Sequence, residues 1–253
     1  MELGLSGKTA VVTGGSSGLG SAVCEAFSAE GANVLLGYLS HELEARRLAE
    51  GLSATYSVTV IPVRVDVREA EEIDAMFAAA VENFGGFDIL VNNAGTWPLR
   101  KVVDIGDEEW EETIRVNLTS GFLTSKRAAT YFLREMRAGR IINIVSINAF
   151  QGSTQGHAHY AAAKGGLLSF TFSLAREVAP YGITVNAVCP GMMRTPMNEA
   201  VLAEHEEDYV SRIPLRRIST PGEVASSVVF LASEKASYIT GSTLNVSGGM
   251  VMR

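Results

Sequence analysis

Short apolar runs alternate with segments of helical periodicity along the whole chain. Runs typical of buried strands cover residues 9–13, 33–38, 59–65, 87–91 and 140–146. Between them, apolar residues recur every three or four positions, as Ile73, Met76, Phe77 and Ala80 do. This alternation predicts one α/β domain over residues 1–253, with parallel strands covered by helices on both faces.

A proline in one strand and an asparagine in one helical region add detail to this predicted fold. Pro62 lies inside the third run, and because proline cannot donate to a strand ladder, this strand is predicted at an edge of the sheet. The doubly wound order 3-2-1-4-5-6 also places the third strand at the edge. A long helical region is predicted from about Asp107 to Arg137. Asn117 interrupts its apolar stripe, so this side chain needs a partner or a bound water.

Composition and charge exclude several classes of protein. Of the 253 residues, 47% are hydrophobic and 19% are charged, as in soluble enzymes with large cores. The net charge of −7 gives no electrostatic reason to bind nucleic acid or an anionic membrane. No apolar run approaches the roughly 20 residues of a membrane span, and the first residues do not resemble a signal peptide. Cys24 and Cys189 lack metal-ligand spacing and are expected to be buried free thiols, which favours a cytoplasmic location.

A glycine-rich loop directly follows the first strand and precedes a helical pattern. It reads Gly14-Gly15-Ser16-Ser17-Gly18-Leu19-Gly20. A loop of this kind lets a pyrophosphate approach the backbone, and the following helix N-terminus offers N–H groups and a favourable dipole. The context predicts a dinucleotide site, and a glycine-rich turn without a ligand is the alternative.

The ends of the second and third strands carry further candidate cofactor contacts. Tyr38, Leu39 and Ser40 end the second strand, with neither the carboxylate typical of NAD binding nor the arginine typical of NADP binding. The missing carboxylate favours NADP slightly. Asp66 and Val67 follow the third strand, where Asp66 can accept a hydrogen bond from an adenine amino group, cap the next helix, or do both.

The fourth strand is followed by Asn92-Asn93-Ala94-Gly95. Small residues here allow a cofactor to pass close by, and the asparagine amides can tie the loop to neighbouring strands. Trp97 comes next, at a place where it either lines a substrate pocket or lies exposed in a loop.

The residues best suited to chemistry lie at and after the end of the fifth strand. Tyr160 and Lys164 are one helical turn apart on an alanine-rich segment, so they share a face. An adjacent ammonium would lower the tyrosine pKa from its usual value near 10. Ser146 lacks a G-x-S-x-G motif and is interpreted as an oxyanion donor rather than a nucleophile. His157 and His159 have no companion ligands, so no metal is expected, and both are expected to line a pocket or the surface.

These motifs resemble the short-chain dehydrogenase/reductase family over essentially the whole chain. The matching residues are Thr13-Gly14-x-x-x-Gly18-x-Gly20, Asn92-Asn93-Ala94-Gly95, Asn117, Ser146, Tyr160-x-x-x-Lys164 and Pro190-Gly191. The resemblance implies a single-domain Rossmann fold with seven parallel strands in the order 3-2-1-4-5-6-7. Residues 183–188 and 243–246 would then be the sixth and seventh strands, and residues from about 192 to 217 a mobile substrate lid.

The resemblance also implies roles for individual residues. Tyr160 would be the general acid/base, Ser146 would orient the substrate oxygen, Lys164 would lower the tyrosine pKa and hold the nicotinamide ribose, and Asn117 would anchor a relay water. The cofactor-binding set comprises Gly14, Ser16, Ser17, Gly18, Leu19, Gly20, Tyr38, Leu39, Ser40, Asp66, Val67, Asn93, Ala94, Gly95, Tyr160, Lys164, Pro190, Gly191, Met193 and Thr195. NADP-preferring members often carry a basic residue at the Ser17 or Leu39 position, and its absence leaves the cofactor choice open.

The implied activity is hydride transfer between NAD(P)(H) and a ketone or secondary alcohol. The favoured substrate is a 3-oxoacyl thioester, free or linked to a carrier protein or coenzyme A. A mixed polar and aromatic pocket of Ser146, Trp97, Asn148, Gln151 and His157 would also suit a sugar, a polyol or a cyclic alcohol. An alternative of another class is a non-catalytic, cofactor-binding regulatory subunit. A homotetramer is expected, with dimer contacts along residues 118–137 and 164–179.

Overall fold

The strands of this computed structural model, which describes residues 2–153 and 156–252, form one parallel sheet. Within these residues the sheet has seven strands in the order β3-β2-β1-β4-β5-β6-β7, and every neighbouring pair is parallel. The strands are β1 (Thr9–Val12), β2 (Asn33–Tyr38), β3 (Val60–Arg64), β4 (Ile89–Asn92), β5 (Arg140–Ile144), β6 (Thr184–Pro190) and β7 (Thr243–Val246). The predicted strand order is confirmed, including the edge position of the strand that contains Pro62.

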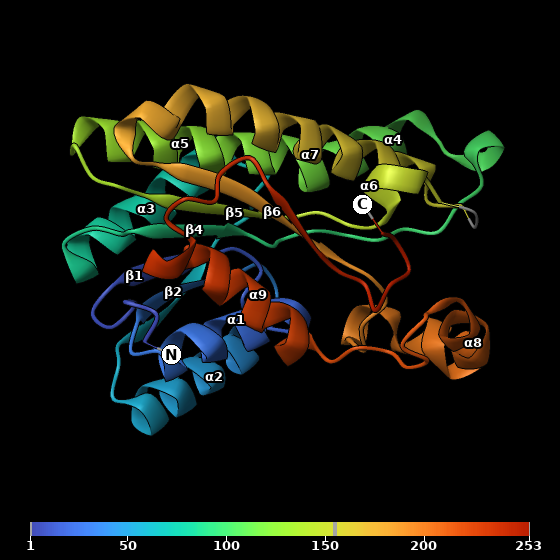
Figure 1. The fold of residues 1–253 in the computed structure, drawn as a ribbon, viewed down its shortest axis with the longest axis horizontal. Helices are drawn as coiled ribbons and strands as arrows, with labels where there is room; N and C mark the ends of the chain where they lie inside the picture. Colours follow the sequence, from blue (N-terminus) through green and yellow to red (C-terminus); the bar gives the residue numbers. More distant parts are fainter. Residues whose placement is uncertain (1, 154–155, 253) are drawn as a thin grey trace.

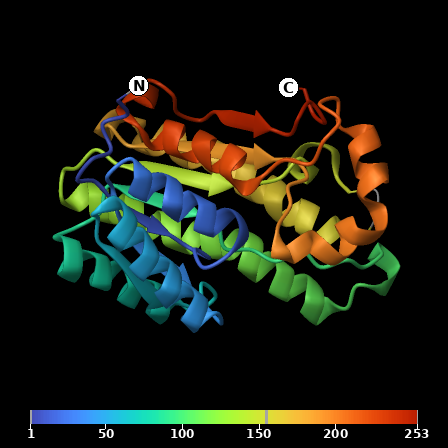
Figure 2. The same cartoon turned by 90° about the horizontal axis from the view of Figure 1, so that it is seen from below.

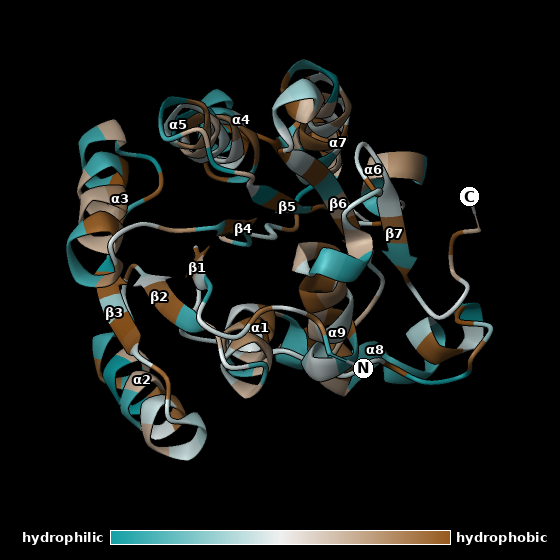
Figure 3. Cartoon of the chain, turned by 60° about the vertical axis from the view of Figure 1, so that its left-hand side comes forward, coloured by the Kyte–Doolittle hydropathy of each residue, from teal (hydrophilic) through white to brown (hydrophobic). Residues whose placement is uncertain are grey.

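Helices cover both faces of the sheet (Figures 1 and 3). One layer holds α1 (Gly18–Ala29), α2 (Glu42–Tyr56) and α9 (Pro221–Ala232). The other layer holds α3 (Ala70–Phe84), α4 (Asp107–Ile114), α5 (Ser120–Arg134) and α7 (Ala158–Val178). The short helix α6 (Asn148–Gln151) and α8 (Glu199–Arg212) follow the carboxyl ends of β5 and β6, and α8 stands at one end of the molecule (Figure 2).

Two apolar cores lie on the two sides of the sheet because successive strand residues point to opposite faces. In β1, Val12 packs in the core with α1, α2 and α9, whereas Val11 packs in the core with α3, α5 and α7. Cys24 and Cys189 are buried free thiols, as expected. Across the described residues, no helix is both long and apolar enough to cross a membrane.

The helical region predicted from about Asp107 to Arg137 is confirmed as far as Arg134, but a change of helix type divides it. α4 ends at Ile114, a π-helical turn covers Arg115–Thr119, and α5 then runs to Arg134. The amide of Asn117, in the middle of the π turn, donates to the carbonyl of Thr113 at 3.1 Å. A one-residue widening leaves the hydrophobic period almost unchanged, so periodicity alone does not reveal it. Such π turns occur frequently at functional sites.

Candidate active site

A cavity of about 780 Å³ opens at the carboxyl ends of the parallel strands, where open α/β sheets bind ligands. It brings together residues from nearly the whole length of the chain. Every residue of the sequence-based set lines it: Gly14, Ser16, Ser17, Gly18, Leu19, Gly20, Tyr38, Leu39, Ser40, Asp66, Val67, Asn93, Ala94, Gly95, Trp97, Asn117, Ser146, Asn148, Gln151, His157, Tyr160, Lys164, Pro190, Gly191, Met193 and Thr195.

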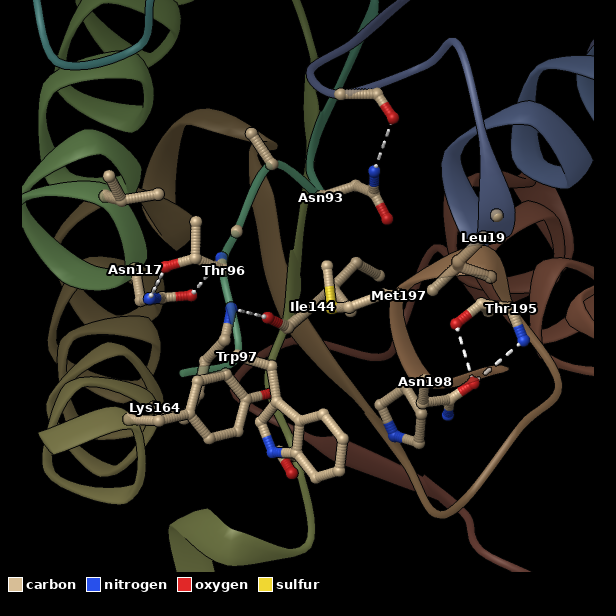
Figure 4. A pocket seen from close by; sticks show the side chains of 18 of the residues that line it. Leu19, Asn93, Thr96, Trp97, Asn117, Ile144, Lys164, Thr195, Met197 and Asn198 are labelled. Atoms are coloured by element: carbon tan, nitrogen blue, oxygen red, sulfur yellow. Dashed lines mark hydrogen bonds between the residues drawn. The ribbon is translucent and has the colours of Figure 1, made fainter. Parts of the chain in front are cut away.

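The glycine loop after β1 leaves no room for side chains at its critical positions. A Cβ on Gly20 would lie 2.0 Å from the carbonyl oxygen of Gly14, and Gly14 itself has φ +64°. The amide of Asn93 donates to that same carbonyl at 3.0 Å (Figure 4). Within the described residues, α1 begins at Gly18 without a side-chain cap from Ser17. Its first N–H groups are therefore available to an anionic ligand.

Asn92 anchors this region to the neighbouring strand and helix. Its amide nitrogen donates to Asn143 Oδ1 and Ser125 Oγ, both at 2.8 Å, and its carbonyl oxygen accepts from Thr124 Oγ1 at 2.6 Å. Asn143 in turn donates to Thr171 Oγ1 at 2.8 Å. The predicted tie between the asparagine segment and its neighbours is confirmed for Asn92. A buried, fully bonded polar network of this kind fixes the geometry around it.

Asp66 does not cap the helix that follows it. The N-cap of α3 is Glu69, so the capping interpretation is wrong. The carboxylate of Asp66 instead pairs with the guanidinium of Arg68, and this pairing lowers the pKa of Asp66. Arg68 also contacts Glu112 of α4 at 2.6 Å. Sequence reasoning missed both Arg68 and Glu112, although both line the cavity.

Asn117 holds the loop after β4 against the π turn. Its Oδ1 accepts from the backbone N–H of Thr96 at 3.2 Å, and its Nδ2 donates to Thr96 Oγ1 at 3.2 Å. A Cβ on Gly95 would lie 2.8 Å from Asn117 Oδ1 and 3.6 Å from Lys164 Nζ. Both polar groups therefore flank the same glycine, on one side of the cavity (Figure 4).

Lys164 is buried, and its ammonium donates to the carbonyl of Ile144 at 2.9 Å. Burial lowers its pKa from 10.5 to about 8, because a low-dielectric environment disfavours the charged form. Its Nζ lies 5.8 Å from the ring centre of Tyr160, so the two side chains do share a face as predicted.

The expected decrease in the Tyr160 pKa is wrong for the protein without ligand. Burial raises this pKa from 10.0 to about 12, although the hydrogen bond with Ser146 acts in the opposite direction. The nearest cation, Lys164, is itself desolvated and engaged with Ile144, so it does not offset the burial of the phenol. At neutral pH Tyr160 therefore keeps its proton and can act as an acid.

Trp97 and His157 form an aromatic wall of the cavity. Their rings stack with centroids 4.3 Å apart and an interplanar angle of 12°. Nδ1 of His157 lies 2.7 Å from the carbonyl oxygen of Pro98, so it is the protonated nitrogen and donates. Burial lowers the pKa of His157 below its ordinary value, which favours neutral imidazole with Nε2 as an acceptor.

His159 differs from the expectation of a pocket or surface residue. Its side chain is fully buried between α7 and α4 and lies behind the cavity wall. The hydrophobic spacing around it is that of an ordinary helix, so nothing in the sequence indicated this burial. Among the described residues, no group of three or more His, Cys, Asp or Glu side chains could hold a metal ion.

The segment that follows β6 leaves the sheet after Met193 and comes back beside Met193 at Ser219. Met193 and Ser219 form an isolated bridge, and the N–H of Arg194 donates to the carbonyl of Ser219 at 3.0 Å. Between them lie a 3₁₀ turn (Pro196–Asn198) and α8, which is kinked at His205. Thr195 bonds to Asn198 on the side of the cavity opposite Asn117 (Figure 4).

Several residues of the cavity were missed by sequence reasoning. Thr96 stands directly after the asparagine segment, and its adjacency could have identified it. Met197, Tyr209, Arg212 and Met250 also line the cavity, but they come from α8, the turn before it and the C-terminal tail. Their positions depend on how these segments fold back, which leaves no local signal.

Comparison with known proteins gives consistent full-length matches. A family model described as enoyl-(acyl carrier protein) reductase matches residues 14–251. The 3-oxoacyl-(acyl-carrier-protein) reductase FabG of Vibrio cholerae is 41% identical over 250 residues, which are 99% of this chain and 100% of that protein. The Aquifex aeolicus protein of the same name is 39% identical over the same shares.

Solved structures agree with these sequence matches. A short-chain type dehydrogenase/reductase from Mycobacterium marinum has a TM-score of 0.95 at 32% identity and covers 100% of this chain and 98% of its own. A short-chain dehydrogenase/reductase of Brucella melitensis, described as a glucose/ribitol dehydrogenase, has a TM-score of 0.91 at 34% identity and covers 100% of both chains.

Proposed function

The chain belongs to the short-chain dehydrogenase/reductase family, and we propose that it reduces the 3-oxo group of a 3-oxoacyl thioester with NADPH. It is an NAD(P)-dependent oxidoreductase. The observation that carries the proposal is the convergence of Asn117, Ser146, Tyr160 and Lys164 on one cavity beside a bare glycine loop. Full-length identity of about 40% to 3-oxoacyl-(acyl-carrier-protein) reductases supports the substrate class.

The residues present fit a nicotinamide dinucleotide. Gly14, Gly18 and Gly20 leave the backbone open at the start of α1, where a diphosphate would accept N–H groups. Asp66 and Val67 would face the adenine, and Thr195 would meet the nicotinamide end. Leu39 and Ser40 would face the ribose, and the absence of a carboxylate there supports NADPH over NADH.

Tyr160 would supply the proton of the reaction. A bound nicotinamide supplies the hydride, and negative charge then develops on the substrate oxygen. Tyr160 holds its proton at neutral pH because its pKa is about 12, and it would donate this proton to the substrate oxygen. Ser146 Oγ accepts from the N–H of Asn148 at 3.2 Å, so its own proton points outward, toward the Tyr160 phenol. With a substrate oxygen between the two hydroxyls, Ser146 would donate this proton to that oxygen instead.

Lys164 and Asn117 would complete the site from the side opposite the lid. The ammonium of Lys164 would hold the nicotinamide ribose while it keeps its bond to Ile144. A water between Lys164 Nζ and Asn117, the two groups that flank Gly95, would return a proton to Tyr160. We also propose that the substrate lid expected at residues from about 192 to 217 is the segment between Met193 and Ser219, because the bridge between these two residues closes its base and the segment supplies cavity residues such as Met197 and Tyr209.

A sugar or polyol dehydrogenase is the second candidate. The wall formed by Trp97, Asn148, Gln151 and His157 combines an aromatic face with hydrogen-bonding groups, which also suits a hydroxylated ring. A non-catalytic subunit explains less, because it gives no reason for the Ser146 hydroxyl to bond to the Tyr160 phenol.

A second copy of the chain is the partner expected along α5 and α7. Phe122 of α5 and Phe172 of α7 are 43% and 37% exposed on this face, together with Leu133 at 39%. These apolar groups support dimer contacts within a homotetramer.

The proposed reaction is tested by a variant that removes only the hydroxyl group of Tyr160. Purified wild type and Tyr160→Phe are compared for NADPH oxidation with an acetoacetyl thioester, a sugar-derived ketone and a cyclic diketone. We expect wild type to prefer the thioester and the variant to lose about 10³-fold in kcat. NADPH binding, followed by its fluorescence, should change by less than about twofold, because binding uses other contacts.

Tyr181→Phe is the matched control, since Tyr181 is exposed on a turn far from the cavity lining. It should behave as wild type. Normal turnover by Tyr160→Phe would refute the role of the phenol, and preference for the sugar-derived ketone would favour the second candidate.

A further inference from the structure

His159 occupies an unusual place for a polar side chain. It is fully buried, and neither ring nitrogen has a hydrogen-bond partner in the part of the chain that the structure describes. Oε1 of Glu109 in α4 lies 3.4 Å from Nε2. His159 immediately precedes Tyr160 in the first turn of α7.

Glu109 connects His159 to the loop that follows β4. Its second oxygen, Oε2, lies 2.5 Å from Nε of Arg100. Arg100 belongs to the segment 97–100, which begins with the aromatic wall residue Trp97. One carboxylate therefore faces both the helix that carries the phenol and the loop that carries the wall.

Two further hydrogen bonds join the same two segments. The backbone N–H of Arg100 donates to the carbonyl of Gly156 at 2.6 Å, and the side-chain Nδ1 of His157 donates to the carbonyl of Pro98 at 2.7 Å. Gly156 has φ +88°, and a Cβ there would lie 2.9 Å from the carbonyl oxygen of Arg100. Residues 97–100 and 156–159 thus form one close-packed unit, which we name the strap.

Packing alone does not explain a histidine at position 159. A buried polar group that lacks a full hydrogen bond costs free energy, and an apolar side chain of similar size would avoid that cost. The feature that an apolar side chain cannot reproduce is the polar contact of Nε2 with Oε1 of Glu109. The benefit of the histidine must therefore lie in where it holds the first turn of α7.

We propose that His159 and Glu109 are positioning residues, which fix the first turn of α7 against the Trp97 loop so that the Tyr160 phenol and the aromatic wall keep one relative geometry. This inference rests on the proposed role of Tyr160 as the proton donor. Catalysis tolerates little displacement of a reacting group, so loosening the strap should slow the chemical step and leave cofactor binding intact.

The kinetic test uses His159→Phe, Glu109→Gln and the double variant on the full-length protein. We expect each single variant to lower kcat with the best ketone about 10-fold and to change the NADPH Kd by less than about twofold. Because the two side chains act as one unit, the double variant should be no worse than either single one. Glu108→Gln, a neighbouring exposed carboxylate of α4, is the matched control and should behave as wild type.

A second readout does not depend on turnover. The chain has two tryptophans, so Trp110→Phe leaves Trp97 as the only tryptophan, whose emission can be excited selectively over that of the tyrosines. In this background, His159→Phe and Glu109→Gln should make Trp97 about twofold more accessible to acrylamide, because the loop is no longer fixed to α7. His159→Gln, which is polar and less bulky, takes the place of His159→Phe if the latter does not fold.

The two readouts separate this inference from the proposed function. If wild type reduces none of the ketones, the proposed function fails, and the accessibility of Trp97 still tests the strap. Unchanged kcat together with unchanged Trp97 quenching in both variants would overturn the inference. Parallel losses of kcat and NADPH affinity would also overturn it, since they would indicate general disruption.

Discussion

At the scale of single residues, burial outweighs adjacency in setting the chemistry of Tyr160 and Lys164. The two side chains share a helix face, and adjacency alone predicts a lowered tyrosine pKa. Desolvation instead raises the pKa of Tyr160 to about 12 and lowers that of Lys164 to about 8. Both shifts favour the neutral form, so the ligand-free site is prepared to donate a proton from the phenol.

The low pKa of Lys164 leads to a pH prediction. The ammonium is charged below pH 8 and loses its charge as the pH rises through about 8, so the NADPH Kd should increase about fivefold between pH 7 and 9.5. NADPH fluorescence titrations at several pH values check this. Lys164→Met should bind weakly with little pH dependence, and an equal pH response in this variant would assign the titration to another group.

The close packing around Gly20 leads to a prediction about NADPH binding. Because a Cβ there would lie 2.0 Å from the carbonyl oxygen of Gly14, Gly20→Ala must displace the loop and should abolish NADPH binding. The matched control is Gly51→Ala in the exposed part of α2, where nothing lies within 4 Å of the new Cβ. This control should retain binding and gain about 0.5–1 kcal/mol in free energy of unfolding. Retained NADPH affinity in Gly20→Ala would show that the loop accommodates the methyl group.

At the scale of elements, the segments around the cavity are held in place at helix ends and at an irregular helical turn. The π turn places Asn117 toward Thr96, and the first turn of α7 is fixed by the strap. The segment proposed as a lid returns to Met193 at Ser219, shortly before α9. There, the N–H of Thr220 donates to Glu223 at 2.9 Å, and Glu223 also pairs with Arg217. This capping box therefore fixes the end of the segment proposed as a lid.

Removing the N-cap of α9 should lower the free energy of unfolding measurably. Thr220→Ala loses the hydroxyl that accepts from the N–H of Glu223, and should cost about 1 kcal/mol in free energy of unfolding. For a chain of this size the midpoint of thermal unfolding should fall by about 2–4 °C. Ser226→Ala, on the exposed side of the same helix, should change it little. A loss in Ser226→Ala as large as in Thr220→Ala would deny the cap any special role.

At the scale of the whole molecule, the crossover connections bring the carboxyl ends of six strands to one cavity. Gly14, Tyr38, Asp66, Asn93, Ser146 and Gly191 follow or end β1 to β6 and meet there. A ligand in this cavity contacts segments from most of the chain, and binding therefore stabilises the native state as a whole.

Because NADPH is the proposed cofactor and binding stabilises the native state, NADPH should raise the midpoint of thermal unfolding more than NADH does at equal concentration. At about 100 times its Kd, a ligand adds about 2.7 kcal/mol to the free energy of unfolding, which corresponds to a rise of about 5–11 °C. Leu39→Arg should widen the difference between the two cofactors by offering a cation to the extra phosphate. An unchanged difference in that variant would show that the phosphate is recognised elsewhere.

From the sequence alone, the first five strands, the edge position of the strand with Pro62 and the glycine loop could be predicted, because each depends on a local pattern. The resemblance to the family added the full strand order and the roles of the site residues, whereas cavity residues such as Arg68, Glu112 and Met250 gave no local signal. Apolar runs, the strand–loop–helix context of Gly14 to Gly20 and the spacing of Tyr160 and Lys164 all lie within short windows. The three-dimensional fold was needed to reveal the π turn at Asn117, the burial of His159, the pairing of Asp66 with Arg68 and the direction of the pKa shift of Tyr160. Each of these depends on which distant segments pack around a residue and how much water they exclude, and a linear pattern does not contain that information.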